Sequence, residues 1–301
     1  MYSRSHIALP GQSATALVPG FASLAPRYDL ILCDIWGVLH DGLKAFPDAG
    51  AALGRFREGG GRVVLVSNAP RPGFAVAKQL DELGVPRAAY DGIVTSGDLT
   101  RAVVLERGRQ ALHHIGPERD LPLFEGTPAR FAPLDSADYV VCTGLFDDEH
   151  ETVVDYEPTL RRMRERDLWM VCANPDIVVE RGEQLILCAG ALAAEYEALG
   201  GETYAGGKPH RPIYEAALAQ GARHLGSPPA HSRILAIGDA IRTDVAGAHG
   251  FGIDALLIAR GIHARELGYS PGKLEAEQAL GWIRSQEFQP RAVAPELVWE
   301  A

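Results

Sequence analysis

Short apolar runs alternate with helical patterns towards both ends of the chain, and this alternation restricts the fold more than any other feature. Five runs read as buried strands: 29–34, 62–67, 92–96, 233–238 and 254–259. Helices are expected between them at 47–59, at 71–83, from about residue 98 and from about residue 243. Strands and helices in this alternation predict an α/β fold whose doubly wound parallel sheet is covered by helices on both faces.

The middle of the chain has a pattern of its own. Prolines, glycines and charges interrupt residues 115–133, after which the chain returns to strand and helix patterns. Strands are expected at 139–143, 168–173 and 184–188, and a helix is expected at 156–167. We therefore predict an inserted α/β domain at residues 110–200, which splits the sheet domain into residues 1–109 and 201–301. The tail after Trp282 is polar and contains proline, so we expect it to be loosely attached.

Composition narrows the class of partner and the compartment. The net charge of −10 disfavours nucleic acid and anionic membranes as partners, because both require a basic face. No apolar run approaches the ~20 residues needed to cross a bilayer, and residues 1–20 lack the apolar stretch of a secretory signal. The cysteines show no C-x-x-C spacing and read as buried, reduced thiols, which is typical of a reducing compartment. We therefore expect a cytoplasmic protein.

Polar residues stand where the predicted core strands end. Asp34 follows the first strand, Ser67 and Asn68 end the second, and Asp239 follows the strand at 233–238. Because functional loops of an open parallel sheet gather at the carboxyl ends of its strands, we expect these residues to meet. Asp244 lies a few residues after Asp239, and Lys208 stands in a Gly-Gly-Lys-Pro segment before a predicted helix.

Each of these residue types suits phosphoryl transfer. Asp34 can attack phosphorus and form an acyl phosphate, and a Mg²⁺ held by Asp34, Asp239 and a backbone carbonyl would offset the negative charges that meet there. The Ser67 hydroxyl and the Asn68 backbone N–H can donate hydrogen bonds to phosphate oxygens. The Lys208 ammonium can face both the phosphate and Asp34, and Asp244 can hold a metal-bound water or orient Lys208.

Five sequence motifs resemble those of a known family. They are DIWGVLHDG (34–42), VSN (66–68), GKP (207–209), GDAIRTD (238–244) and NPD (174–176). The first four resemble the motifs of the haloacid dehalogenase-like (HAD) hydrolases. The G-D-x-x-x-T-D form, the large insertion and the NPD segment resemble class IIA of that superfamily, which includes NagD-type, 4-nitrophenyl phosphate and pyridoxal phosphate phosphatases.

The resemblance implies a Rossmann-like HAD core with an inserted C2-type α/β cap, and it implies a role for each site residue. Asp34 would be the nucleophile and a Mg²⁺ ligand, the Trp36 backbone carbonyl a second ligand, and Asp239 a third. Asp244 would support the metal site, and Lys208 would steady both the nucleophile and the phosphate. Ser67 and Asn68 would bind the phosphate.

Within the cap, the resemblance implies that Asn174 and Asp176 shape the substrate side of the pocket. The partner would be a small phosphorylated metabolite such as a sugar phosphate, and a homodimer is possible because relatives often dimerise through the cap.

Trp36 is a departure from the family pattern. Phosphatases of the family carry an Asp at this position, which protonates the leaving group and later activates water, and such general acid–base help is typically worth about 10² to 10⁴ in rate. His40 and Asp41 are the nearest replacements in sequence. The indole itself reads either as a packing residue at the cap interface or as a stacking surface for substrate.

The loss of this acid leaves open whether another residue replaces it, whether the leaving group needs little protonation, or whether the reaction is not monoester hydrolysis. Three hypotheses for the function follow. The leading one is a Mg²⁺-dependent phosphatase that forms an aspartyl-phosphate on Asp34. A second keeps the Asp34 nucleophile but cleaves another bond, such as carbon–phosphorus or carbon–halogen; the retained Asp239 and Asp244 favour phosphoryl chemistry over dehalogenation. The third is a phosphometabolite-binding protein whose catalysis has weakened.

Overall fold

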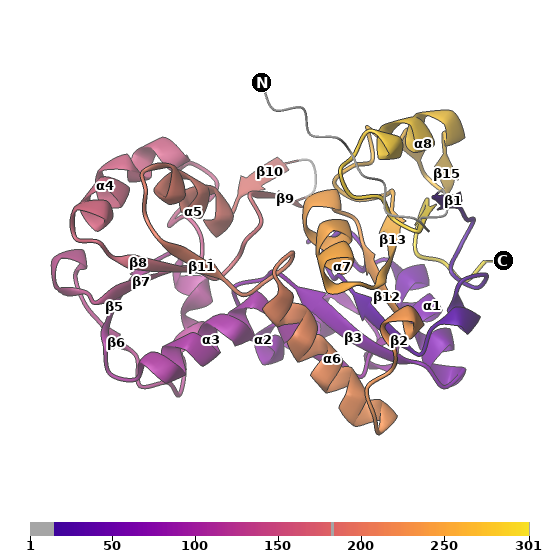
Figure 1. Cartoon of the computed structure of the whole chain (residues 1–301), viewed down its shortest axis with the longest axis horizontal. Helices are drawn as coiled ribbons and strands as arrows, with labels where there is room; N and C mark the ends of the chain where they lie inside the picture. Colours follow the sequence, from indigo (N-terminus) through magenta and orange to yellow (C-terminus); the bar gives the residue numbers. More distant parts are fainter. Residues whose placement is uncertain (1–14, 182–183, 301) are drawn as a thin grey trace.

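The structure, a computed structural model, describes residues 15–181 and 184–300 and shows two sheets of parallel strands (Figure 1). Residues 1–14, which belong to the segment 1–20 where we predicted no secretory signal, lie outside the described residues. The larger sheet has seven strands in the order β1-β16-β13-β12-β2-β3-β4, all paired in parallel. Its strands are β1 (Ala16–Leu17), β2 (Leu30–Cys33), β3 (Arg62–Ser67), β4 (Gly92–Thr95), β12 (Ile234–Gly238), β13 (Asp254–Ile258) and β16 (Ala292–Ala294).

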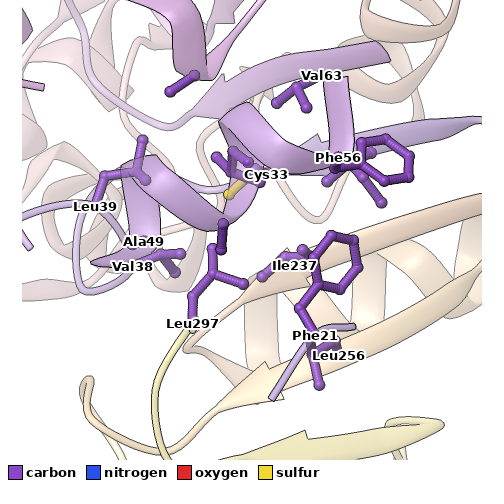
Figure 2. Close-up of a cluster of buried hydrophobic side chains, with 14 of the residues drawn as sticks. Phe21, Cys33, Val38, Leu39, Ala49, Phe56, Val63, Ile237, Leu256 and Leu297 are labelled. Carbon is purple, nitrogen blue, oxygen red and sulfur yellow. The ribbon is translucent and has the colours of Figure 1, made fainter. Parts of the chain in front are cut away.

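Helices cover both faces of this sheet. They are α1 (Pro47–Glu58), α2 (Gly73–Leu83), α6 (Arg211–Leu225), α7 (Ala246–Phe251) and α8 (Ala276–Arg284). Successive residues of β2 point to opposite faces: Ile31 packs with side chains of α1 and α2, whereas Leu32 packs with those of α6, α7 and α8. Figure 2 shows part of the first cluster, in which Cys33 of β2 lies among side chains of α1, β3 and β12. The predicted doubly wound α/β core is confirmed.

The second sheet is formed by the middle of the chain in the order β11-β8-β7-β5-β6. Its strands are β5 (Ala111–Ile115), β6 (Arg130–Phe131), β7 (Tyr139–Cys142), β8 (Trp169–Cys172) and β11 (Thr203–Ala205). α4 (Glu157–Glu165) and α5 (Ala189–Ala198) pack on one face, while α3 (Ser96–Arg107) packs on the other. β11 extends this sheet past residue 200, and the division of the chain into domains at 110 and 200 stays a prediction.

The chain passes from the large sheet to the small one through α3 and returns between β11 and α6. α3 runs from β4 of the large sheet to β5 of the small one, and its N-terminus is closed by a capping box between Thr95 and Asp98 (Figure 1). The antiparallel hairpin of β9 (Val178–Arg181) and β10 (Gln184–Leu187) projects from the small sheet towards the large one. A second small hairpin pairs β14 (Tyr269–Ser270) with β15 (Lys273–Leu274). Among the described residues, no helix combines the length and the apolar character needed to cross a bilayer.

The expectation of a loosely attached tail is wrong. After Trp282 the chain forms β16, which pairs with β13 and β1, and the side chains of β16 are at most 1% exposed. Leu297 is 3% exposed and packs in the cluster of Figure 2. The prolines and charges around this strand concealed it, because three apolar residues are too short a run to show a period.

Leu297→Ala should lower the free energy of unfolding by about 2–5 kcal/mol, because it removes a buried side chain and leaves a cavity. Urea denaturation followed by circular dichroism measures the loss. Leu43→Ala is the matched control, since Leu43 is 69% exposed, and it should change stability by less than about 0.5 kcal/mol. Equal stability of the two variants would show that the tail does not contribute to the core.

Candidate active site

The residues predicted from strand ends meet at the carboxyl edge of the large sheet. Asp34 follows β2, and its backbone N–H donates to the Ile237 carbonyl of the neighbouring strand β12 at 2.7 Å. Asp239 follows β12, and Asp244 lies in a single π-helical turn (Ile241–Val245) before α7. One oxygen from each of the three carboxylates lies within 4.8 Å of the others.

Lys208 connects this carboxylate cluster. Its Nζ lies 2.6 Å from Asp34 Oδ1 and 2.8 Å from Asp244 Oδ1, and its side chain is 5% exposed. Burial alone would lower the pKa of Lys208, but the charges of Asp244 and Asp34 outweigh it and raise that pKa well above its usual value. The lysine is therefore a fixed ammonium between two acids.

The carboxylates are electrostatically crowded. Burial raises the pKa of Asp34 well above its usual value, in spite of the opposing attraction of Lys208. Burial and the charge of Asp244 raise the pKa of Asp239 to about 7. One ammonium therefore does not offset the three acids, and another cation at this position would favour their charged forms. The donor set consists of carboxylate oxygens, which hard divalent cations prefer, so the residues fit such a metal ion.

Close packing fixes the orientation of Asp239. Its Oδ2 accepts a hydrogen bond from the Ile262 N–H at 2.9 Å. A Cβ atom at Gly37 would stand 2.1 Å from that oxygen, and one at Gly261 would stand 1.9 Å from it. Gly37 also has a φ of +78°, which favours glycine. These two glycines leave room for the carboxylate beside Asp34.

Ser67 and Asn68 differ in what they offer to a phosphate. The Ser67 hydroxyl accepts a hydrogen bond from the Ala69 N–H at 3.1 Å, so its own hydrogen can be donated elsewhere. The Asn68 side chain is engaged by the protein: Oδ1 accepts from the Lys208 N–H at 2.7 Å, and Nδ2 donates to Asp176 Oδ1 at 2.9 Å. Asn68 thus ties the lysine loop and the small sheet to the loop after β3, a role that the sequence did not reveal.

Asn174 and Asp176 follow β8 of the small sheet and line a cavity that opens over the carboxylate cluster. Asn174 Oδ1 accepts from the Asp176 N–H at 3.0 Å, which shapes the turn after β8. Burial raises the pKa of Asp176, although Lys208 and the hydrogen bond from Asn68 oppose this shift. Both residues therefore face the cluster, and their part in substrate selection stays a prediction.

Trp36 reaches from the large sheet to the β9–β10 hairpin. Its Nε1–H donates to the backbone carbonyl of Glu180 at 2.5 Å. Its ring stands edge-on to His40 with 5.0 Å between centroids, and a Cβ at Gly42 would lie 2.5 Å from the indole. The indole packs at the contact between the two parts of the chain, as one of the two sequence interpretations held. The ring also borders the cavity.

Neither sequence neighbour of Trp36 has the protonation behaviour of an efficient general acid. Burial lowers the pKa of His40 to about 4, and its Nδ1 accepts from the Gly42 N–H, so the ring is neutral at pH 7. Partial burial would raise the pKa of Asp41, but hydrogen bonds from the Lys44 and Leu43 N–H groups lower it. An effective general acid needs a pKa near the working pH.

A cavity of about 200 Å³ opens over the cluster and is bordered by loops of both sheets. Sequence reasoning did not identify several charged side chains of its lining: Arg71, Arg119, Asp120, Asp148, Arg181 and Arg260. Arg260 directly follows the predicted strand at 254–259 and was overlooked there, whereas the others lie away from the ends of predicted strands and no motif marked them. The cavity can enclose a small molecule with its reacting group against Asp34.

Comparison with known proteins identifies the class. Residues 31–127 match the family described as haloacid dehalogenase-like hydrolase, and residues 205–298 match the one described as HAD-hydrolase-like. A haloacid dehalogenase-like hydrolase from Brucella suis 1330 has 48% sequence identity and a TM-score of 0.84, covering 94% of this chain and 100% of that chain. The chain belongs to the haloacid dehalogenase-like hydrolases, and the prediction of a hydrolase is confirmed.

Two further relatives place the chain within this family. NagD from E. coli K-12 shares the fold at 22% identity, with a TM-score of 0.65 over 91% of this chain and 98% of that chain. A D-glycerol 3-phosphate phosphatase of Mycobacterium tuberculosis is 26% identical over 92% of this chain and 77% of its own length. The predicted membership of the haloacid dehalogenase-like superfamily is thus confirmed, and the fold is the one that NagD has.

Millimolar Mg²⁺ should stabilise the protein, because a cation that binds only the folded state offsets the crowded carboxylates; about 2.7 kcal/mol is expected at 100 times the dissociation constant. Asp239→Asn should remove most of this gain, because it removes one charge of the cluster. Urea denaturation with Mg²⁺ and with EDTA measures both. Asp147→Asn, which removes an exposed carboxylate, is the control. An equal gain in wild type and Asp239→Asn would exclude the cluster as the metal site.

Proposed function

We propose that this hydrolase is a Mg²⁺-dependent phosphatase, which cleaves a small phosphorylated metabolite through an aspartyl-phosphate on Asp34. The observation that carries the proposal is the ion pair of Lys208 with Asp34 and Asp244, buried at a strand end beside Asp239. The name of the M. tuberculosis relative, a glycerol 3-phosphate phosphatase, supports the same chemistry.

In the first step the free oxygen of Asp34 attacks phosphorus. Lys208 holds Oδ1 at 2.6 Å and so orients the other oxygen, Oδ2, towards the incoming phosphate. A bound Mg²⁺ supplies the positive charge that keeps the nucleophile ionised and lets a phosphate dianion approach. The Ser67 hydroxyl and the Lys208 ammonium donate to phosphate oxygens as charge shifts onto them. The bond from phosphorus to the ester oxygen then breaks, and the leaving group departs with the bonding electron pair as an oxyanion, which takes its proton from water.

In the second step water attacks the aspartyl-phosphate and restores Asp34, releasing inorganic phosphate. Both steps would benefit from a general acid–base group, but Trp36 carries no exchangeable proton of suitable pKa. His40 and Asp41 do not replace it by the pKa arguments above. The proposed phosphatase therefore relies on electrostatic stabilisation and on a leaving group that departs with little protonation.

Asn68 and the Trp36 indole would hold the two parts of the chain together around the substrate. The Asn68–Asp176 and Trp36–Glu180 hydrogen bonds both cross from the large sheet to the small one. They would exclude water from the reacting groups, which strengthens the electrostatic interactions inside. The Trp36 carbonyl as a metal ligand, the cytoplasmic location and a homodimer stay predictions.

Purified protein should hydrolyse p-nitrophenyl phosphate in the presence of Mg²⁺, and the rate should fall to background with EDTA. Asp34→Asn should also abolish turnover, because the amide cannot act as the nucleophile. Release of p-nitrophenol measures both. Asp41→Asn is the matched control, since Asp41 caps its own loop. Activity that survives Asp34→Asn would refute the aspartyl-phosphate. No turnover in wild type, with activity in Trp36→Asp, would favour a phosphometabolite-binding protein.

A series of aryl phosphates should show a steep dependence on the leaving group. From p-nitrophenyl to phenyl phosphate we expect kcat/KM to fall by at least about 100-fold, the lower end of what a general acid contributes. Trp36→Asp should flatten this dependence by restoring an acid at this position.

Trp36→Phe provides the control for this series, because it removes the bond to Glu180 without adding an acid. It should keep the steep dependence whatever its absolute rate. A flat dependence in wild type would mean that another residue protonates the leaving group.

A further inference from the structure

Arg71 differs from the other cations that line the cavity. Arg119 and Arg181 both pair with Asp148, at 3.0 Å or less, and Arg260 pairs with Glu296 at 2.9 Å. Lys208 pairs with two acids of the cluster. Within residues 15–181 and 184–300, Arg71 has no carboxylate within 4.0 Å, and its hydrogen-bond partner is the neutral Gln79, whose Oε1 lies 2.6 Å from Nη2.

The charge of Arg71 is partly removed from water as well as unpaired. The residue is half-buried, and burial lowers its pKa, which the nearby Asp120 opposes. An arginine carries five N–H donors, and the bond to Gln79 uses one of them. A guanidinium with open donors is suited to bidentate binding of a carboxylate or phosphate group.

The backbone holds Arg71 firmly in place. Pro70 and Pro72 flank it, and each proline ring restricts its own φ and the conformation of the residue before it. The start of α3 packs against this segment: the Gly97 N–H donates to the Ala69 carbonyl at 3.0 Å, and a Cβ at Gly97 would lie 2.5 Å from the Arg71 carbonyl. The loop that carries Ser67 thus also presents a fixed cation to the cavity.

Asp120 is the nearest competitor for this cation. It is 3% exposed and also lines the cavity. Among the described residues it forms no ion pair with Arg71 within 4.0 Å, so it leaves the N–H donors of the guanidinium available. Its negative charge still weakens the attraction of the site for anions.

We propose that Arg71 is a specificity-determining residue that binds a second anionic group of the substrate, so that the preferred substrates are phosphomonoesters carrying a carboxylate or another acidic group at the end remote from the ester. This inference rests on the proposed phosphatase function and adds the substrate class. The phosphate would lie against Asp34 and Ser67, and the second acid would reach Arg71 in the lining of the same cavity.

The test uses 3- and 4-carboxyphenyl phosphate with their neutral carboxamide counterparts, which have similar size and an aryl leaving group. We measure kcat/KM for each ester and form the carboxylate-to-carboxamide ratio. Arg71→Gln should lower this ratio by about 10- to 100-fold for at least one isomer, which is the usual worth of a hydrogen bond to a charged group. Arg71→Lys should keep part of the preference, because the charge remains.

Two further variants sharpen the comparison. Asp120→Asn should raise the ratio, because it removes the competing negative charge. Lys78→Gln removes a positive charge from the exposed surface of α2, outside the cavity lining, and should leave the ratio unchanged. An unchanged ratio in Arg71→Gln would overturn the proposal even if all rates fell together, since a uniform loss means phosphate binding or structural support.

The two proposals fail in distinguishable ways. Hydrolysis of the carboxamide esters by wild type tests the phosphatase function, and the ratio tests Arg71. If wild type hydrolyses none of the esters, the proposed phosphatase function is wrong. Calorimetric affinities of the same ester pairs for wild type and Arg71→Gln still measure the preference for the carboxylate over the carboxamide. Equal affinities for carboxylate and carboxamide in wild type would then overturn the role of Arg71.

Discussion

The ammonium of Lys208 between Asp34 and Asp244 is the interaction on which the arrangement of the site depends. Three buried carboxylates would repel one another without a cation, and removing one partner of a buried pair generally costs about 3–5 kcal/mol. Asn68 fixes the backbone of Lys208 from the loop after β3, so the lysine loop joins strands that are distant in sequence. The same crowding leaves a surplus of negative charge, so the cluster fits a metal ion in addition to the ammonium of Lys208.

Trp36 gives a second, more peripheral connection. The position that usually carries an acid here carries a donor that bonds to the backbone of the β9–β10 hairpin. A backbone carbonyl offers this contact whatever the side chain of residue 180, so the bond depends on where the hairpin lies rather than on its sequence. The indole at this position cannot transfer a proton, but its hydrogen bond attaches the small sheet to the large one. The site thus keeps Asp34, Lys208, Asp239 and Asp244 together while position 36 carries no carboxylic acid.

Much of the core could be predicted because long apolar runs that end at polar residues have one physical solution, a buried parallel sheet with its functional groups at one edge. Asp34 and Asp239 with Asp244 were found in this way, whereas Lys208 was found in a Gly-Gly-Lys-Pro segment before a predicted helix, and the structure brings them together. β16 was missed because a three-residue strand shows no period. The Asn68–Asp176 and Trp36–Glu180 contacts were beyond reach, because they depend on how the small sheet is placed over the large one.

The distribution of charge around the cavity also depends on how the small sheet is placed over the large one. The net charge of −10 describes the whole chain, yet the cavity lining holds both acids, among them Asp34 and Asp239, and Arg71, which has no carboxylate partner among the described residues. In the proposed mechanism a phosphate dianion would approach Asp34 and Asp239 only with the help of Lys208 and a metal ion, so attraction and repulsion would oppose each other there. A second anionic group of the substrate at Arg71 would be repelled by Asp120 but not by a cluster of carboxylates. Binding energy from that remote contact would then help to hold the phosphate against Asp34, which is how an enzyme without a general acid can gain rate from substrate structure.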